Sequence, residues 1–198
     1  LQSCVCSQSR KPTKYLQQTN ATSTREPSMK HLFLSLFLLS ITPVYAQEAS
    51  PDTAHDNLAF FAPFIGTWKA DFIDGTSDVS IYKWILGGKA VRIMHSINDG
   101  DYGGEALLHW NTDKQAITYR YVTTASFYTD GTITPTDHGF DAHEVVHGNM
   151  GGITETRAGY TMKEGEFQVW SQFLKDGEWT EKTQSTYRKA PDAEVKFK

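Results

Sequence analysis

The part of the chain beyond residue 46 contains no cysteine, because the only two, Cys4 and Cys6, lie near the start of the sequence. A domain built from that part has no disulfide bonds and depends on its core for stability. The same part has no apolar run long enough for a membrane-spanning helix. It also has no cluster of basic residues, and the whole chain has a formal net charge of −4. These absences predict a protein with no membrane insertion and no nucleic-acid partner.

Several motifs that would identify an enzyme are also missing. The sequence has no Gly-x-Ser-x-Gly nucleophile elbow, no cysteine nucleophile beyond residue 46 and no glycine-rich loop for phosphate groups. We therefore predict no cofactor and no metal site. No stretch after Ile65 has helical periodicity of useful length, so the fold must be built from strands.

The beginning of the chain is predicted to lie outside the folded domain. Residues 1–28 are polar and without periodicity, and we interpret them as a non-structural leader or reading-frame extension. Residues 29–46 combine a short basic region, an apolar run and a small-x-small ending at Ala46, which is typical of a secretory signal peptide. Residues 47–57 are predicted to be flexible. We expect a secreted protein of the bacterial periplasm, since a cysteine-stapled extracellular module is excluded.

Residues 58–190 are predicted to form one domain of short antiparallel strands, followed by a tail at 191–198. Apolar and polar side chains alternate in residues 67–72, as on a strand with one buried face. Similar segments follow, separated by short turns such as the two-residue Gly87-Gly88. This pattern predicts an all-β fold, an antiparallel up-and-down barrel of about eight to ten strands. Residues 58–65 have the apolar spacing of a short helical turn that would cap one end.

Two short motifs mark the ends of this domain. Gly66 and Trp68 lie at the start of the first strand, and Arg188 lies near the end of the last. This set resembles the lipocalin-like (calycin) barrels, in which such an arginine packs across the tryptophan. The resemblance implies a lipocalin-like barrel with Gly66, Trp68 and Arg188 as structural residues. A tryptophan that plugs one end fits this role, because its ring is large and apolar and its N–H needs a partner.

A closer resemblance is to the DUF1579-type family, lipocalin-like bacterial proteins of uncharacterised function. It rests on the run 64–68 and the segment 176–188, and it covers roughly residues 58–189. It implies the fold and says little about activity. Haem-binding nitrobindin-like barrels begin with Gly-x-Trp-x-Gly-x-Gly, whereas Ala70 and Phe72 stand here at the later glycine positions, which argues against haem.

The predicted strands carry many aromatic side chains, and a small barrel can enclose one ligand. We expect an aromatic-lined cavity that binds a small apolar or amphipathic molecule, so the predicted partner is a small lipophilic compound. In the alternative, these rings only fill the core and cover the exterior, and the barrel is structural or binds a protein partner. The candidate ligand-binding residues are Trp84, His95, Trp110, Tyr119, Tyr121, Arg157 and Trp170.

A histidine motif supports a different function, the hydrolysis of a small ester or lactone. His143, Glu144 and His147 match the HExxH string of zinc proteases, but that motif requires a helix that places both histidines on one face. On a strand Glu144 points away from the histidines, which lie about 13 Å apart, too far for one metal ion. The hydrolase alternative is a histidine-centred site in the barrel, with or without the assistance of a metal ion. It keeps these three as candidate catalytic residues, provided that histidines such as His95 or His109 converge with them.

Overall fold

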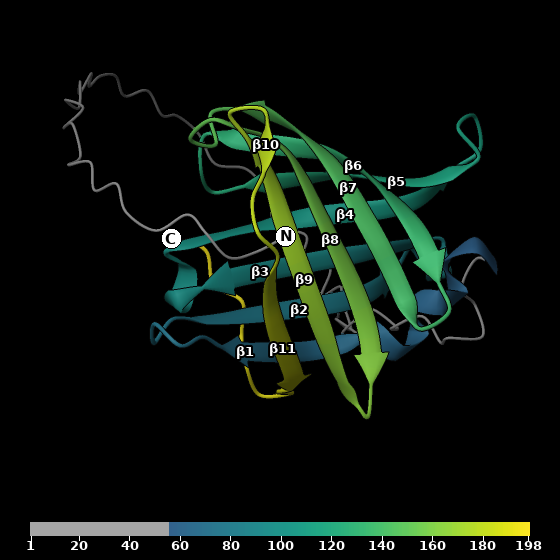
Figure 1. The fold of residues 1–198 in the computed structure, drawn as a ribbon. Coiled ribbons are helices and arrows are strands. Elements are labelled where there is room, and N and C mark those ends of the chain that lie inside the picture. The colour runs from purple at the N-terminus through teal and green to yellow at the C-terminus, as the bar shows by residue number, and fades with distance from the viewer. Residues whose placement is uncertain (1–55) are drawn as a thin grey trace, which may run out of the picture. The chain divides into compact units, whose positions relative to one another are not determined.

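The computed structural model describes residues 56–198, which form an all-β domain with short helical turns (Figure 1). The predicted leader (1–28), the signal peptide (29–46) and most of the flexible segment (47–57) lie outside the described residues. Among the residues described, no helix is both long and apolar enough to cross a membrane. The helical turns are η2 (Asp56–Phe64), η3 (Leu86–Gly88) and η4 (Asn98–Gly100). The strands are β1 (Gly66–Asp71), β2 (Ser77–Ile85), β3 (Ala90–Ile97), β4 (Tyr102–Asn111), β5 (Ala116–Thr123), β6 (Phe127–Thr136), β7 (Gly139–Gly148), β8 (Ile153–Lys163), β9 (Glu166–Lys175), β10 (Glu178–Trp179) and β11 (Thr183–Lys189).

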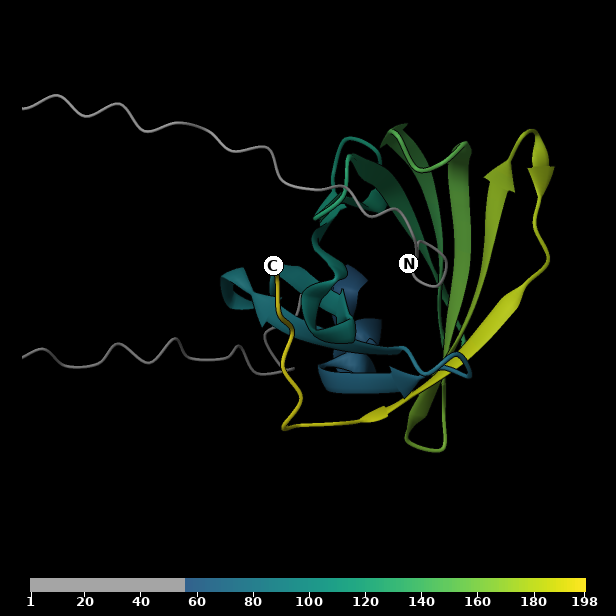
Figure 2. The same ribbon diagram turned by 90° about the vertical axis from the view of Figure 1, so that its left-hand side faces the viewer.

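Ten of the described strands close into an antiparallel barrel (Figures 1 and 2). Each strand from β1 to β8 pairs with the next one along the chain. Strand β11 then joins β9 to β1, while the short β10 pairs with β9. The predicted fold class, an up-and-down barrel of eight to ten strands with an N-terminal helical turn, is confirmed. Closure satisfies the edge groups that an open sheet would leave unpaired.

One turn differs from the prediction. The sequence predicts a two-residue turn at Gly87-Gly88, but the last strand pair joins Ile85 to Ala90, so four residues connect β2 and β3. Leu86 has φ of 52°, and the two glycines that follow also have positive φ. Positive φ is easy for glycine and uncommon for leucine. The wider turn therefore strains Leu86, whose side chain is 71% exposed.

Helix η2 closes one end of the barrel, as the apolar spacing of its residues predicts (blue in Figure 1). Its side chains Leu58, Phe61 and Phe64 are buried, and the Phe64 ring lies 5.7 Å from the ring of Phe167 on β9. Trp68 is also buried at this end, and its indole N–H donates to the carbonyl oxygen of Phe64 at 2.6 Å. The indole thus joins the first strand to the helix.

The predicted contact between Arg188 and Trp68 is not formed. Lys189 takes that place, with Nζ 3.8 Å from the centre of the Trp68 ring and 2.8 Å from the carbonyl oxygen of Ile65. The register explains the shift, because Trp68 pairs with Lys189 and side chains alternate between the faces of a strand. Arg188 therefore points outward, where it binds Glu166 at 2.7 Å.

The barrel interior contains two layers of different chemistry, which we call the aromatic layer and the polar layer. The aromatic layer lies next to η2, and the polar layer lies farther from η2 along the same strands. The aromatic layer contains Phe61, Phe64, Trp68, Tyr82, Phe140, Tyr160 and Phe167. The polar layer contains Asp78, Ser80, His95, Tyr119, Tyr121, Thr129, Glu144, Thr156 and Ser171.

The segment after β11, predicted as a tail at 191–198, lies on the outer face of the barrel. The backbone N–H of Ala190 donates to the carbonyl oxygen of Thr67. Farther along, the N–H of Lys196 donates to Ser96 Oγ, and its ammonium lies 3.0 Å from Asp99. The chain therefore runs from β1 to β3 across the outside of the sheet.

Candidate functional site in the barrel interior

A chain of hydrogen bonds crosses the polar layer. Nδ1 of His95 lies 3.2 Å from Oδ1 of Asp78, and its Nε2 contacts the hydroxyl of Tyr121. The Tyr121 hydroxyl in turn lies 3.0 Å from that of Tyr102. The first three residues are buried, whereas Tyr102 is partly exposed. The chain thus links a buried carboxylate to a phenol at the edge of the interior.

Asp78 accepts further hydrogen bonds, from the hydroxyl of Tyr187 at 2.6 Å and that of Ser80 at 3.2 Å. A neutral His95 with its proton on Nδ1 fits this arrangement, since it donates to Asp78 and accepts from Tyr121. Tyr102 then donates to Tyr121. This assignment leaves the lone pairs of the Tyr102 oxygen available to a further donor.

Glu144 on β7 is a second buried carboxylate, and it is only 2% exposed. The hydroxyl of Tyr119 donates to its Oε1 at 2.6 Å, and that of Thr156 donates to its Oε2 at 2.9 Å. Among the described residues, its partners are these two hydroxyl groups and no cation. A buried carboxylate without a cationic partner is unfavourable for folding, which makes Glu144 a functional candidate.

Two glycines allow the tyrosine rings to lie flat against the barrel wall. A Cβ atom on Gly131 would lie 2.3 Å from the Tyr119 ring, and one on Gly104 would lie 2.6 Å from the Tyr121 ring. Such distances are shorter than van der Waals contact, so only glycine leaves room for the rings. The space lets the Tyr119 hydroxyl reach Glu144, and it lets the Tyr121 hydroxyl reach the imidazole.

Burial raises the pKa of the tyrosine hydroxyls in this network. Desolvation is the largest cause for the raised pKa of Tyr102, Tyr119, Tyr121 and Tyr187, and the negative charges of the buried carboxylates act in the same direction. These phenols therefore stay protonated at neutral pH and act as hydrogen-bond donors.

A small enclosed space lies where the two layers meet. Its volume is about 10 Å³, and its walls include His95, Tyr121 and Tyr160. That is room for about one water molecule. An organic molecule that contacts the polar layer must therefore do so from the side away from the aromatic layer.

Most of the predicted ligand-binding residues face the interior. His95, Tyr119 and Tyr121 belong to the hydrogen-bonded network just described. Trp84 is buried in the core with its indole N–H unpartnered, and Trp110 packs against the core from a half-buried position. These five residues come from strands β2 to β5, on one side of the barrel.

Two other predicted ligand-binding residues, Arg157 and Trp170, lie on the outer face. The Arg157 guanidinium lies 4.2 Å from the centre of the Trp179 ring, and the Lys182 ammonium lies 3.9 Å from the centre of the Trp170 ring. The strands alternate so that Ala158 and Val169 point inward beside them. The barrel wall therefore separates Arg157 and Trp170 from the interior network.

The HExxH string lies on β7, and the strand separates its members. His143 and His147 face outward and pair with acidic residues there, whereas Glu144 faces inward. His109 is also exposed, and His95 is inside. Within residues 56–198, no group of three or more potential metal ligands occurs. The structure does not bring together the histidines that the hydrolase alternative requires.

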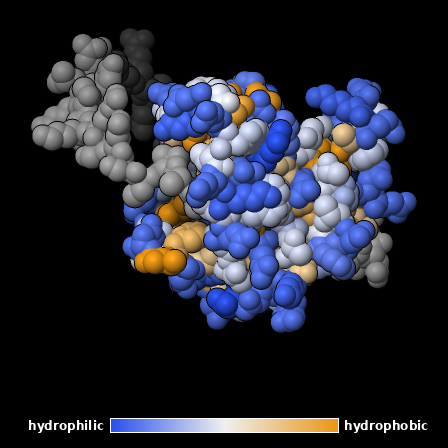
Figure 3. All heavy atoms as spheres, in the orientation of Figure 1, coloured by the Kyte–Doolittle hydropathy of each residue, from blue (hydrophilic) through white to orange (hydrophobic). Residues whose placement is uncertain are grey.

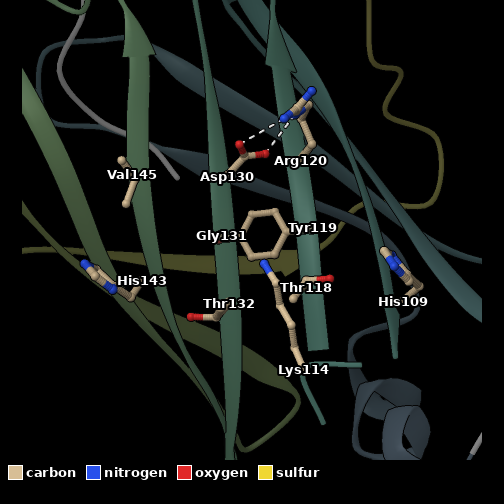
Figure 4. A pocket seen from close by; sticks show the side chains of 10 residues that line it. All are labelled: His109, Lys114, Thr118, Tyr119, Arg120, Asp130, Gly131, Thr132, His143 and Val145. Atoms are coloured by element: carbon tan, nitrogen blue, oxygen red, sulfur yellow. Dashed lines mark hydrogen bonds and ion pairs between the residues drawn. The ribbon is translucent and has the colours of Figure 1, made fainter. Parts of the chain in front are cut away.

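The outer face of β4 to β7 carries a wide groove of about 620 Å³. Figure 4 shows an ion pair between Arg120 and Asp130 across it, at 2.8 Å, with His109 and His143 at its two sides. The face of the molecule in Figure 3 is mostly hydrophilic, with small apolar spots. The two charges at the centre of the groove therefore already have partners in each other.

Several interior residues of the candidate site are missing from the sequence-based candidates: Asp78, Tyr102 and Thr156, which are hydrogen-bonded there, and Thr129, whose hydroxyl has no partner. A signal existed for Asp78, since it lies on the same strand face as Tyr82 and Trp84 by the two-residue period. The predicted pairing of strands with their sequence neighbours would then have placed it near His95.

The barrel as a whole is consistent with the lipocalin-like class, because it is closed, antiparallel and capped by a short helix. The chain matches no protein-family model, and comparison with curated proteins found no match.

Proposed function

We propose that the protein binds one small amphipathic molecule inside the barrel, against the polar layer. The observation that carries the proposal is the chemistry of this layer, where two carboxylates and an imidazole are buried inside the barrel. Buried polar groups are unfavourable for folding compared with apolar ones of similar shape. Their presence beside a filled aromatic layer is best explained by recognition of a ligand.

The cellular setting and the family are part of this proposal. Secretion into a bacterial periplasm is supported by the signal-peptide pattern of residues 29–46. Membership of the DUF1579-type group is supported by the motifs at 64–68 and 176–188. A periplasmic barrel of this kind would bind its ligand without covalent chemistry.

The binding proposal is tested by titration with N-phenyl-1-naphthylamine, a flat and uncharged amphipathic fluorophore. We expect its fluorescence to rise and to saturate at one molecule per chain. Tyr102→Ala should weaken binding, because Tyr102 lies at the edge of the interior and stacks on Phe127. The matched control is Tyr128→Ala on the outer face, where Tyr128 stacks on His147. A titration that does not saturate, or equal effects of the two substitutions, would exclude an interior site.

A second candidate function is acid–base catalysis of ester hydrolysis, which is favoured by the alignment of Asp78, His95 and Tyr121. A carboxylate that orients an imidazole is the arrangement of a general base. However, both ring nitrogens of His95 already have partners, so a substrate would have to displace Tyr121. Hydrolysis of p-nitrophenyl acetate that is abolished by His95→Gln and retained by His143→Gln would support catalysis in preference to binding.

A further inference from the structure

The buried side chains of the described barrel include acidic residues but no lysine or arginine. The charged or titratable side chains buried in the described barrel, apart from tyrosines, are Asp78, Glu144 and His95, and no Lys or Arg is among them. Asp78 accepts from three groups, the imidazole of His95 and the hydroxyls of Tyr187 and Ser80, whereas Glu144 accepts from two hydroxyl groups only. A buried charge is stabilised far better by an opposite charge than by neutral donors. The interior around Glu144 therefore favours a cation.

Thr129 on β6 provides an independent observation in the same place. It is 1% exposed, and its hydroxyl has no hydrogen-bond partner. It pairs with the inward-facing Tyr121 across the sheet, so it also faces the interior. Gly131, two residues along, pairs with Glu144, which puts Thr129 diagonally next to Glu144. A buried hydroxyl without a partner is unfavourable, and a ligand would supply the partner.

One chemical group would satisfy both residues. An ammonium has three N–H donors and no acceptor. The Thr129 oxygen has two free lone pairs, and each carboxylate oxygen of Glu144 accepts only one hydroxyl. Diagonal neighbours on paired strands lie about 7–8 Å apart at the backbone, within the span that one bound ammonium bridges.

Two buried aromatic residues are near Glu144 and Thr129 in the strand register. Phe127 precedes Thr129 by two residues on the same strand face, and Phe173 pairs with Thr156 across β8 and β9. Both rings are buried, and Tyr102 stacks on Phe127 at 6.3 Å between ring centres. Aromatic faces attract cations and also bury an apolar chain. The site therefore suits a molecule with a cationic head and an apolar body.

We propose that the ligand is an amphipathic amine whose ammonium binds between Glu144 and Thr129, with its apolar part against Phe127 and Phe173. This inference rests on the proposed binding function and adds the sign of the ligand's charge to it. It also assigns to Glu144 a role in recognition that the hydrolase alternative did not include.

The experiment compares octylammonium, 1-octanol and octanoate, which share one alkyl chain and differ in charge. Each is titrated by calorimetry into the full chain near neutral pH, below the concentration at which it aggregates. We expect octylammonium to bind at least about tenfold more tightly than 1-octanol, and octanoate to show the weakest binding. A tenfold ratio corresponds to about 1.4 kcal/mol.

Substitutions test the residues. Glu144→Gln keeps an acceptor for Tyr119 and removes the charge, so octylammonium should bind no better than 1-octanol. Thr129→Val should weaken octylammonium by a smaller factor, because it removes one hydroxyl and no charge. The matched control is Glu155→Gln, since Glu155 is a carboxylate on the outer face, bound to His143. Urea unfolding of Glu144→Gln checks that the variant is folded, since the amide keeps an acceptor for Tyr119 and places an NH2 group next to the hydroxyl of Thr156.

The outcomes separate the inference from the function on which it rests. Saturable binding of N-phenyl-1-naphthylamine together with equal affinities for the three octyl compounds would keep the binding function and overturn the cationic ligand. An octylammonium affinity that is the same in the Glu144→Gln variant would overturn the assigned residues. If neither the fluorophore nor any octyl compound binds, both the function and the inference are wrong.

Discussion

The two layers of the barrel interior differ in how much each contributes to holding the fold together. In the aromatic layer, η2 and the strands make ring contacts such as Phe61 with Phe140 at 5.0 Å and Trp68 with Phe167 at 4.8 Å. In the polar layer, buried side chains such as Glu144 are held by hydroxyl groups, and Thr129 has no partner. The aromatic layer stabilises the fold through the burial of apolar surface, whereas the buried polar groups of the polar layer reduce the stability of the fold.

The comparison indicates that the aromatic layer folds the barrel and the polar layer serves binding. A ligand-binding site commonly contributes less to the stability of the fold than an apolar core in the same place would, because its polar groups are arranged to contact a ligand. Substitutions in the aromatic layer should therefore lower the free energy of unfolding, and substitutions in the polar layer should mainly alter ligand binding. The exception is a polar-layer residue that accepts hydrogen bonds from several buried donors, since its removal leaves all of them without an acceptor.

The largest loss of stability is expected for Trp68→Ala. The substitution opens a cavity beside η2 and removes the hydrogen bond to Phe64. We expect the free energy of unfolding to fall by about 4 kcal/mol, as for other buried aromatic residues. Urea unfolding followed by circular dichroism measures the change. In the control Trp170→Ala, on the outer face, the loss should be less than half as large; equal losses would contradict the central role of the aromatic layer.

Asp78→Ala should have the next largest effect, and it is the exception within the polar layer. The substitution leaves the hydroxyls of Tyr187 and Ser80 and the N–H of His95 without their acceptor. We expect a loss of about 3 kcal/mol, because unsatisfied buried donors are costly. Asp78→Asn retains an acceptor and should lose less. If both variants are as stable as the original chain, Asp78 does not organise the network.

Most of the fold could be predicted from the sequence, because strand alternation and short turns are local signals. The capping helix also followed from the spacing of Leu58, Phe61 and Phe64. The partner of Trp68 was predicted one residue too early, at Arg188. The register between β1 and β11, the pair of strands that closes the barrel, depends on segments more than a hundred positions apart in the sequence. A one-residue shift reverses the face on which a side chain lies.

The candidate site was predictable only in part, for a related reason. His95, Tyr119 and Tyr121 were found because they are aromatic or titratable residues on an inward strand face. Arg157 and Trp170 were placed with them because their types suit a ligand, yet their strand positions alternate outward. The pairing of Glu144 with its two hydroxyl donors depends on the register of β5 to β8, which no local pattern reveals.

Alkaline pH tests the burial of both layers at once, without substitutions. Burial raises the pKa of Tyr82 and Tyr160 in the aromatic layer, and that of Tyr119 and Tyr121 in the polar layer, above the ordinary value of about 10. Above about pH 10 the unfolded chain releases these protons while the folded chain keeps them. Stability should therefore be insensitive to these groups below pH 10 and should fall steeply as pH rises beyond it.

The titration of tyrosine absorbance at 295 nm measures this effect. We expect the buried tyrosines to ionise together, at the pH at which the chain unfolds. Separate ionisation of the buried tyrosines while circular dichroism remains native would show that the interior is open to solvent.

The smallest effects on stability are expected where β11 pairs with β1 and closes the barrel. Lys189→Met removes the cation above Trp68 and the hydrogen bond to Ile65, and should lower the free energy of unfolding by about 1 kcal/mol. Arg188→Met removes an exposed ion pair with Glu166, which is worth at most about 0.5 kcal/mol. Urea unfolding of the two variants ranks them; the reverse order would restore Arg188 as the residue that holds Trp68.

The most direct test of binding in the polar layer is the tyrosine-ring ¹H–¹³C spectrum of the full chain during titration with octylammonium. We predict that the ring signals of Tyr102, Tyr119 and Tyr121 shift until one equivalent has bound, while those of Tyr128 on the outer face stay in place. Shifts confined to Tyr128, or no shifts at saturating octylammonium, would contradict a ligand site in the polar layer.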